Sequence, residues 1–434
     1  MSWPLEFIER KRDGLSHSAD DIRRFVEAVR DETMPDYQVS AWLMAAFLQG
    51  LDAEELRSFT AAIAFSGDAA RLPGVVTIDK HSTGGVGDKT TLVVAPLVAS
   101  CGLRVAKLSG RGLGFTGGTI DKLESIPGMD VHLSIERFMR QASELGVALS
   151  GHSLALAPAE GKFYALRDVT GTVPSIPLIA SSIVSKKIAG GADAFVFDVK
   201  CGSGAFMRDL DEAMKLARAL VELSASLGRR SSCLISDMET PLGEWVGNSV
   251  EVLEAVQVLS GDGPQDTREL CLALSAEMLL LGGAANDADS AAEIVRGALD
   301  DGSGLRKFDA LVRAQGGDSE VCSSPMKVLP LASQKMVLES PRAGRVEMMD
   351  ARSAGEAVRA LGGGRSRKED VVDPSVGIRI LKKRGDCIEK GEPLAEVFYN
   401  DEARLESASR HIESMYSVGD GNIEARGLIM GRVD

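Results

Sequence analysis

Apolar residues recur at helical spacing through the first part of the chain. Ile22, Phe25 and Val29 fall on one face of a predicted helix. From Tyr37 to Leu48 the sequence is apolar nearly all round, which predicts a helix buried in a core or in a subunit interface. No strand pattern interrupts this region, so we predict a helical domain over residues 1–66.

Strand and helix patterns alternate from about residue 72. Short apolar runs such as Val105–Leu108 and Ala194–Val199 are separated by helical patterns, which is typical of an α/β domain with a mainly parallel sheet. The apolar helical stretch Ile176–Ile188 breaks this alternation. We therefore predict that residues 160–190 return to the helical domain, which makes that domain discontinuous.

The character of the chain changes again after about residue 330. Short strand-like pieces with turns, such as Val376–Leu381, precede a helical pattern over Asp401–Tyr416. This predicts a small C-terminal α+β domain over residues 331–434. The predicted fold class is therefore α/β, in which the helical domain and the small C-terminal domain flank a larger α/β domain over residues 70–159 and 191–330.

Composition and charge exclude several classes of protein. The chain has 434 residues, too many for one ordinary core, and a formal net charge of −14. That charge argues against a nucleic-acid partner, because such proteins normally carry a basic face. The sequence has neither a secretory signal nor an apolar run long enough to span a membrane. Its six cysteines are scattered and its five histidines form no close pair, so we expect a cytoplasmic protein with reduced thiols and no histidine-based metal site.

One glycine-rich stretch, Asp79–Thr91, lies between an apolar run and an apolar helical pattern. Glycines let the backbone approach an anion, and free N–H groups at the start of a helix point towards it. Lys80 adds a cation, and Ser82, Thr83 and Thr91 add hydroxyl groups. The lysine precedes the glycines, so this is not the phosphate loop of nucleoside triphosphatases. We interpret the stretch as a phosphate cradle, with an ordinary tight turn as the alternative.

Two further segments carry related chemistry. A second glycine-rich loop, Lys107–Thr119, also follows a strand pattern, so the two loops could converge on one anion. In the segment Tyr164–Lys187, Arg167 and Lys186 would be buried cations that need an anionic or accepting partner. A simple ion pair between Arg167 and its neighbour Asp168 is the alternative.

With a fourth strand-to-loop segment, these stretches resemble the pyrimidine nucleoside phosphorylase and thymidine phosphorylase family over nearly the whole chain. The matching motifs are Lys80–Asp88, Ser109–Thr119, Arg167–Thr170 and Asp198–Met207. The resemblance implies a pentosyltransferase that reversibly phosphorolyses uridine, thymidine or deoxyuridine to free base and α-(deoxy)ribose 1-phosphate. It also implies phosphate as the co-substrate, no organic cofactor, and a homodimer built through helical domains that carry the pyrimidine site.

The resemblance assigns roles to residues at matching positions. One group would bind phosphate: Lys80, Ser82, Thr91, Ser109 and Thr119. A second group would bind the pyrimidine: His81, Arg167, Ser182 and Lys186. A third group would form apolar walls around the base: Leu113, Val173, Ile179 and Phe206. His81, Arg167 and Lys186 would also be catalytic, because cations near the base stabilise its developing negative charge and a histidine can hydrogen-bond to or protonate it.

Lys107 bears on specificity. Broad-specificity pyrimidine members of the family tend to have Lys here, whereas members restricted to thymidine have Met. The resemblance therefore implies that this chain accepts both uridine and thymidine. The alternative is a solvated lysine at the end of a strand.

Phe115 departs from the family pattern. It stands where the family has a His that can bond across the cleft, and a phenyl ring cannot make that bond. We consider three consequences: weaker closure with lower turnover, a changed substrate, or simple repacking.

Lys89 departs from the pattern in a loop where some relatives bind potassium. That ion site would involve Gly87, Lys89, Leu242, Trp245 and Glu254, and Trp245 is itself unusual there. One interpretation is that the Lys89 ammonium replaces the ion opposite Glu254. The other is that Lys89 points to solvent and leaves a potassium site intact.

Two other functions stay open on sequence grounds. One is a relative that acts on another glycosyl substrate, such as a nucleoside monophosphate phosphorylase or an anthranilate-type phosphoribosyltransferase. The other is a non-catalytic nucleoside-binding protein, suggested by Phe115 and Trp245. Retention of Arg167, Ser182 and Lys186 favours a pyrimidine base, and retention of the phosphate ligands argues against a non-catalytic role.

Overall fold

The helical domain contains two segments that are distant in the sequence. The computed structural model describes residues 3–68, 70, 72, 74, 76–112, 114–152, 156–367, 369–421, 423 and 426–434. The helices of this domain are α1 (Trp3–Arg12), α2 (Ala19–Arg30), α3 (Asp36–Gln49), α4 (Ala53–Ala64), α8 (Pro158–Thr170) and α9 (Ile176–Ala189). Phe163 of α8 packs its ring 5.1 Å from Phe59 and 5.6 Å from Phe25. The prediction of a discontinuous helical domain is therefore confirmed.

The central domain is built on a mainly parallel sheet. Its strands are β1 (Ile78–Ser82), β4 (Ala194–Cys201), β5 (Arg230–Asp237) and β13 (Ile429–Val433), in that order, with β13 antiparallel to β5. Two more parallel strands, β2 (Val105–Ser109) and β3 (Val147–Gly151), continue beside β1 through a bridge between Thr77 and Arg104. Parallel strands end at the same edge of a sheet, so the loops after β1, β2 and β4 are brought to one side.

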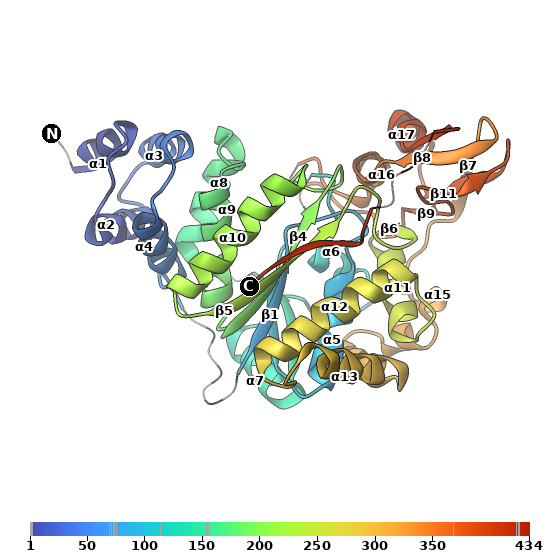
Figure 1. Cartoon of the computed structure of the whole chain (residues 1–434), viewed down its shortest axis with the longest axis horizontal. Helices are drawn as coiled ribbons and strands as arrows, with labels where there is room; N and C mark the ends of the chain where they lie inside the picture. Colours follow the sequence, from blue (N-terminus) through green and yellow to red (C-terminus); the bar gives the residue numbers. More distant parts are fainter. Residues whose placement is uncertain are drawn as a thin grey trace.

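Helices cover both faces of this sheet (Figure 1). They are α5 (Thr90–Ser100), α6 (Thr119–Glu124), α7 (Ile135–Leu145), α10 (Leu210–Ser226), α11 (Ser249–Leu259), α12 (Gln265–Gly282), α13 (Ala288–Asp300) and α14 (Ser303–Ala314). Phe195 and Phe197 of β4 pack with α10, whereas Ala194 and Val196 pack with α12 on the opposite side. Successive residues of a strand face opposite sides, which explains why β4 is apolar without alternation.

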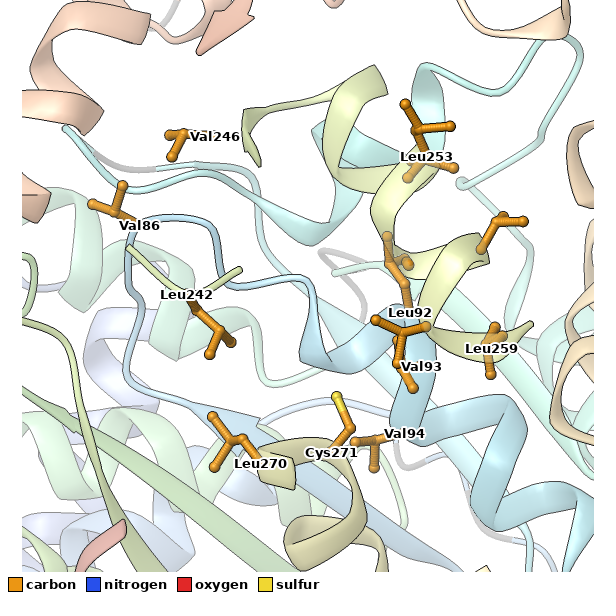
Figure 2. Packing of buried hydrophobic residues seen from close by; sticks show 14 of the residues in the cluster. Val86, Leu92, Val93, Val94, Leu242, Val246, Leu253, Leu259, Leu270 and Cys271 are labelled. Carbon is orange, nitrogen blue, oxygen red and sulfur yellow. The ribbon is translucent and has the colours of Figure 1, made fainter. Parts of the chain in front are cut away.

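The core beside the first glycine-rich loop is made by α5, α11 and α12 (Figure 2). Leu92 and Val93 of α5 face Leu253 and Leu259 of α11, and Leu270 of α12 lies below them. All five side chains are almost fully buried. The start of α5, where the loop ends, is thus held in the largest apolar cluster of the described residues.

The C-terminal domain packs beyond the ends of the central strands. The short helices η1 (Ser319–Cys322) and α15 (Pro325–Val328) precede it and pack beside α11 and α14 of the α/β domain. The elements of the C-terminal domain are β7 (Gln334–Glu339), β8 (Gly344–Met349), α16 (Ala351–Val358), the π-helical turn η2 (Arg359–Gly363), β9 (Gly377–Ile380), β10 (Cys387–Ile388), β11 (Pro393–Tyr399), α17 (Glu402–Ser414) and β12 (Tyr416–Gly419). They form one sheet of order β10-β8-β12 and a second of order β6-β9-β11-β7, where β6 is Trp245–Gly247. The predicted α+β character of this region is confirmed.

Two strands cross the domain boundary expected at residue 331. β6 leaves the α/β segment to pair with β9, and β13 returns from the C-terminus to the edge of the central sheet at β5. Figure 1 shows the C-terminal strand lying along that sheet. These two strand pairings therefore join the C-terminal domain to the α/β domain.

Candidate active site

The loops after β1, β2 and β4 meet at one edge of the sheet. The backbone N–H of Lys200 donates to Thr83 Oγ1 at 2.9 Å, and that of Thr83 donates to the carbonyl of Asp198 at 3.1 Å. The ammonium of Lys122, in the helix α6 that follows the second loop, donates to the carbonyl of Asp88 at 2.8 Å. The two glycine-rich loops and the fourth segment thus form one site, as their positions after parallel strands predict.

Two glycines are required by close backbone approach. Gly118 lies so near the backbone that a Cβ atom there would be 2.1 Å from the N atom of Gly112. Gly87 has a φ of +72°, and a Cβ atom there would be 2.5 Å from the carbonyl oxygen of Leu242. A larger side chain at either position would separate the segments that the loops bring together.

A group of buried charges lies under the first loop. The ammonium nitrogens of Lys80 and Lys200 lie 3.1 and 2.8 Å from Oδ2 of Asp198, and Lys80 also donates to Thr90 Oγ1 at 2.5 Å. Burial alone would raise the pKa of the nearby Asp88 carboxyl, but the ammonium groups of Lys200 and Lys80 hold it well below its usual value. Two buried ammonium groups are therefore gathered beside the first loop, close to the carboxylates of Asp88 and Asp198.

The expected phosphate ligands line the same edge. Ser82 ends β1 and donates its hydroxyl hydrogen to Asp88, so that hydroxyl must turn before it can donate to an anion. Thr91 lies in the first turn of α5, Ser109 ends β2 and Thr119 begins α6. Within the described part of the chain, the hydroxyl groups of Thr91, Ser109 and Thr119 have no hydrogen-bond partner. These three hydroxyls are thus free to donate to a ligand.

His81 is close to lysines of both the α/β domain and the helical domain. Burial, followed by the ammonium groups of Lys187, Lys107 and Lys186, lowers the pKa of His81 well below its usual value. The imidazole is consequently neutral near pH 7, and it can accept a hydrogen bond at one ring nitrogen and donate one at the other.

Lys107 is a buried lysine, so the alternative of a solvated one is wrong. Its ammonium donates to the carbonyl of Lys80 and lies 3.4 Å from Oδ1 of Asp79, whose other oxygen accepts from Lys187 at 2.7 Å. Burial, with added repulsion from Lys187 and Lys80, lowers the pKa of Lys107 to about 7 despite the attraction of Asp79. Lys107 thus changes charge in the physiological range.

Arg167 is buried and is held by carbonyl groups of the α8–α9 connection. Its Nη2 donates to Val173 O at 2.8 Å, its Nη1 to Leu178 O at 3.0 Å and its Nε to Thr172 O at 3.4 Å. The neighbouring Asp168 is exposed and makes no ion pair with it among the described residues. The alternative of a local Arg–Asp pair is therefore wrong, and strongly accepting carbonyls take its place.

Glu160 is a buried acid that sequence reasoning missed. It lies on α8 and accepts from the Ser182 hydroxyl and, at 3.0 Å, from the Lys186 ammonium. Lys186 also donates to Ser182 Oγ at 2.9 Å. The available signal was the spacing of Glu160, Tyr164 and Arg167, which puts all three on one face of a helix. An acid in the first turn of a helix is common, so that signal was weak.

The expected apolar walls are only partly described. Val173 and Ile179 are half-buried beside Arg167 and Ser182 on the helical side. Phe206 is exposed on the α/β side, and its ring centroid lies 6.2 Å from that of Phe115. Leu113 lies outside the described residues.

The expected potassium ligands surround the Lys89 ammonium. This Nζ atom lies 2.9 Å from the carbonyl oxygens of Leu242 and Trp245 and from Oε2 of Glu254. Gly87 provides the close approach to Leu242 described above. Burial alone would lower the pKa of Lys89, but the Glu254 carboxylate raises it. The interpretation of a solvent-directed Lys89 is wrong, and these oxygens do not fit a separate ion because the ammonium already uses them.

The described residues show no metal-binding cluster and no membrane-spanning helix. They contain no group of three or more His, Cys, Asp or Glu side chains arranged to hold a metal ion. Among these same residues, every helix is too short or too polar to cross a lipid bilayer.

Three family models match successive parts of the chain. They are described as "Glycosyl transferase family, helical bundle domain" over residues 5–67, "Glycosyl transferase family, a/b domain" over residues 74–305 and "Pyrimidine nucleoside phosphorylase C-terminal domain" over residues 345–419. Among solved structures, anthranilate phosphoribosyltransferase from Thermus thermophilus superposes with a TM-score of 0.58, covering 71% of this chain and 99% of that one. Its sequence is 17% identical, so it shows a shared fold alone.

Curated relatives match over nearly the full length. The pyrimidine-nucleoside phosphorylase of Geobacillus stearothermophilus is 45% identical over 431 residues, 99% of each chain. The enzymes of that name from Staphylococcus haemolyticus and Bacillus subtilis are 48% and 47% identical over 400 residues, 92% of each chain. The resemblance in the four motifs thus extends to all three domains, and the chain belongs to the pyrimidine-nucleoside phosphorylase family.

Proposed function

We propose that this chain catalyses the phosphorolysis of pyrimidine nucleosides, releasing the free base and α-(deoxy)ribose 1-phosphate. The observation that carries the proposal is that His81 is close to two sets of cations. Lys80 belongs to the group at the glycine-rich loops, and Lys186 belongs to the helical domain together with Arg167. One set suits phosphate and the other suits the carbonyl groups of a pyrimidine.

The proposed reaction is a direct displacement at the sugar carbon C1′. A phosphate oxygen forms a bond to C1′ while the bond from C1′ to the pyrimidine nitrogen breaks, and that electron pair leaves with the base. The phosphate proton is ultimately transferred to the base, so no other reactant is needed. Bound phosphate is already a nucleophile, and the protein's main contribution to this step is orientation.

Arg167 and Lys186 would stabilise the negative charge that develops on the departing pyrimidine. Arg167 has five N–H groups, and the described carbonyls use three of them, so two are left for a base oxygen. His81 is neutral, so its proposed role is a hydrogen bond to the base rather than donation of a full proton from an imidazolium.

Lys80, Thr91, Ser109 and Thr119 would hold the phosphate, and Ser82 would join them after turning from Asp88. Lys80 spends two of its three N–H groups on Asp198 and Thr90, which leaves one for phosphate. We also propose that the Lys89 ammonium serves in place of a monovalent cation, so that the enzyme uses no bound potassium.

A homodimer in the cytoplasm completes the proposal. α3 exposes a stripe of apolar side chains at positions one and two turns apart, namely Tyr37, Ala41, Met44 and Leu48. Tyr37 and Leu48 are 74% and 71% exposed. Such a stripe beside a buried face is typical of a subunit interface. The six cysteines are all unpaired thiols, which fits a reducing compartment.

Phosphate-dependent release of uracil from uridine tests the proposed function. We expect release with phosphate and no release when phosphate is omitted, together with formation of ribose 1-phosphate. Activity only with a phosphoribosyl donor, or binding of uridine without cleavage, would instead indicate the related transferase or the non-catalytic alternative.

A further inference from the structure

We propose that Glu160 is a positioning residue that fixes the direction of the Ser182 hydroxyl and thereby selects bases with an N3–H group, uracil and thymine, over cytosine. The inference rests on the proposed function, because it assumes that the base binds at α8 and α9. It concerns a residue outside the motifs that carry the family resemblance, and it follows from the contacts between these two helices.

The Ser182 hydroxyl has one hydrogen and two acceptor positions. The Glu160 carboxylate and the Lys186 ammonium both contact its oxygen. An ionised carboxylate can only accept and an ammonium can only donate. Ser182 must therefore give its hydrogen to Glu160 and accept from Lys186. One acceptor position is left, so a ligand atom that hydrogen-bonds to Ser182 must be a donor.

The groups along α9 then present donors and an acceptor in a fixed order. Arg167 is anchored at the carbonyl of Leu178, Ser182 follows one turn later, and Lys186 follows after another turn. Leu178, Ser182 and Lys186 thus share one face of the helix. A ligand that lies along this face meets a donor at Arg167, an acceptor at Ser182 and a donor at Lys186.

This order matches one class of pyrimidine. The edge of uracil or thymine presents a carbonyl oxygen, an N3–H donor and a second carbonyl oxygen. Cytosine presents an amino group, an unprotonated N3 and one carbonyl oxygen, so two of its three groups oppose those of the protein. A buried polar group left without its partner is costly, and this cost provides the discrimination.

The burial of the Glu160 carboxylate makes this direction stable. Glu160 is 4% exposed and Ser182 is 7% exposed, whereas the Lys186 side chain is 23% exposed. The ring of Tyr164 lies 5.4 Å below the Lys186 ammonium and limits where it can turn. The Glu160 carboxylate is thus enclosed, and Lys186 is the more solvent-exposed of its two partners.

The experiment compares uracil and cytosine binding to the full-length protein. The ratio of the two dissociation constants is measured by ligand-observed NMR, and the ratio of inhibition constants is measured against uridine phosphorolysis. Glu160→Ala and Glu160→Met both remove the acceptor, and the second keeps most of the volume. In each of these two variants we expect the ratio of the cytosine to the uracil dissociation constant to fall by about 10-fold or more. The Ser182 hydroxyl, freed from Glu160, can then donate to N3 of cytosine.

Two variants separate this effect from general damage. Glu160→Gln keeps an acceptor oxygen and should retain the preference to within about threefold. Glu55→Ala removes another buried glutamate, which pairs with Lys11 at 2.7 Å in the same domain, and should change stability without changing the ratio.

Each outcome decides the matter. A narrowed ratio in Glu160→Ala or Glu160→Met, with the ratio kept in Glu160→Gln and Glu55→Ala, supports the proposal. An unchanged ratio in folded Glu160→Met, or equal narrowing in Glu55→Ala, overturns it. Wild-type protein that binds uracil without releasing it from uridine would contradict the proposed function while leaving this test intact. Wild-type protein that binds neither base would overturn both.

Discussion

The ammonium nitrogen of Lys89 lies 2.9 Å from Oε2 of Glu254, and neither side chain is exposed. Lys89 also donates to two carbonyl oxygens, so all three of its N–H groups are used. The same Glu254 carboxylate accepts from the backbone N–H groups of Glu244 and Trp245. This pair ties the start of α5 to the segment before β6, behind the proposed phosphate site.

Replacing Lys89 should make the enzyme less stable and dependent on an added cation. In Lys89→Thr the Glu254 carboxylate loses its partner, and breaking a buried pair typically costs about 3–5 kcal/mol of unfolding free energy. Unfolding in urea measures this loss of unfolding free energy. Part of the lost free energy should return in about 100 mM KCl but not in choline chloride, because a bound cation stabilises the folded state.

Wild-type activity should be the same in potassium and choline salts at equal ionic strength. Surface charge effects are shared by both salts, so a difference between them would report a specific ion. Strong potassium dependence of the wild-type enzyme would contradict the proposed role of Lys89.

Lys107 should make sugar specificity depend on pH. Its pKa is lowered to about 7, so it is an ammonium below that pH and a neutral amine above it. The ammonium is the stronger donor to the extra hydroxyl of a ribose. The ratio of kcat/KM for uridine to kcat/KM for 2′-deoxyuridine should therefore fall as pH rises through about 7. Ionisation of phosphate affects both substrates and cancels in the ratio.

Lys107→Met provides the matched comparison. Without a titrating group, its ratio should be lower than that of the wild type and constant with pH. A ratio that is constant with pH in the wild type, or the same slope in Lys107→Met, would show that Lys107 does not distinguish ribose from deoxyribose.

The depressed pKa of Lys107 also affects stability. In the unfolded chain the lysine keeps its proton up to its ordinary pKa, so the contribution of Lys107 to the free energy of unfolding rises as pH increases above about 7.

The sequence predicts those parts of the site whose position follows from the local pattern of strands and loops. Glycine-rich loops after successive strand patterns must meet at one edge of a parallel sheet, and they do so here. The partners of the lysines could not be predicted, because they depend on strand register and helix packing. Asp198 faces Ser82 across the β1–β4 ladder, and only that register brings its carboxylate to Lys80. Glu160 likewise becomes informative only when α8 lies against α9.

The pairing of the C-terminal segment with the central sheet could also not be predicted from the sequence. β13 is five residues long and contains a glycine, so its pattern is too short to assign. Its position is set by the free edge of β5, which it covers with antiparallel hydrogen bonds. Such pairing between distant segments leaves no periodic signal in either one.

Asp121 should connect the C-terminal domain to phosphate affinity. Its Oδ2 accepts from the backbone N–H of Gly112 at 2.7 Å, while its Oδ1 accepts from Arg365 at 2.7 Å and Arg111 at 3.0 Å. Asp121 thus holds the second glycine-rich loop and a residue of the C-terminal domain together. In Arg365→Ala, we expect the KM for phosphate to rise by about threefold to tenfold with little change in the KM for uridine at saturating phosphate.

Arg342→Ala is the control for this prediction. Arg342 pairs with Asp420 at 2.5 Å within the C-terminal domain, and both side chains are exposed. Its loss should leave both KM values unchanged. If Arg365→Ala behaves like Arg342→Ala, the C-terminal domain does not position the loop through Asp121.

The apolar stripe on α3 should hold two copies of the chain together. Met44 lies in the middle of the stripe, where an aspartate would be buried without a partner in a dimer. Met44→Asp should therefore elute as a monomer in size-exclusion chromatography with light scattering, whereas the wild type elutes as a dimer. Glu27→Gln on α2 changes an exposed residue outside the stripe and should stay dimeric; a monomeric wild type would contradict the prediction.

Phe115 should behave as a packing residue rather than as a missing catalytic group. Its ring lies 6.2 Å from that of Phe206, and the Arg352 guanidinium lies 4.8 Å above it. The Phe115 carbonyl lies close to Gly355, because a Cβ atom on Gly355 would be 2.3 Å from the Phe115 carbonyl oxygen. The ring therefore fills the space between the second loop, the fourth segment and α16, which favours the repacking interpretation.

Phe115→His should lower the unfolding free energy by about 1 kcal/mol, because a neutral imidazole is less apolar and a weaker partner for a guanidinium. Turnover should change by less than about threefold, and the substrate range should stay the same. Phe398→His provides a matched control, because the ring centroid of Phe398 lies 5.4 Å from that of Trp245 and the Arg379 guanidinium lies 5.5 Å from the Trp245 ring. This variant should lose stability alone. A tenfold or greater gain in kcat for Phe115→His would instead show that the chain lacks a hydrogen bond that assists closure.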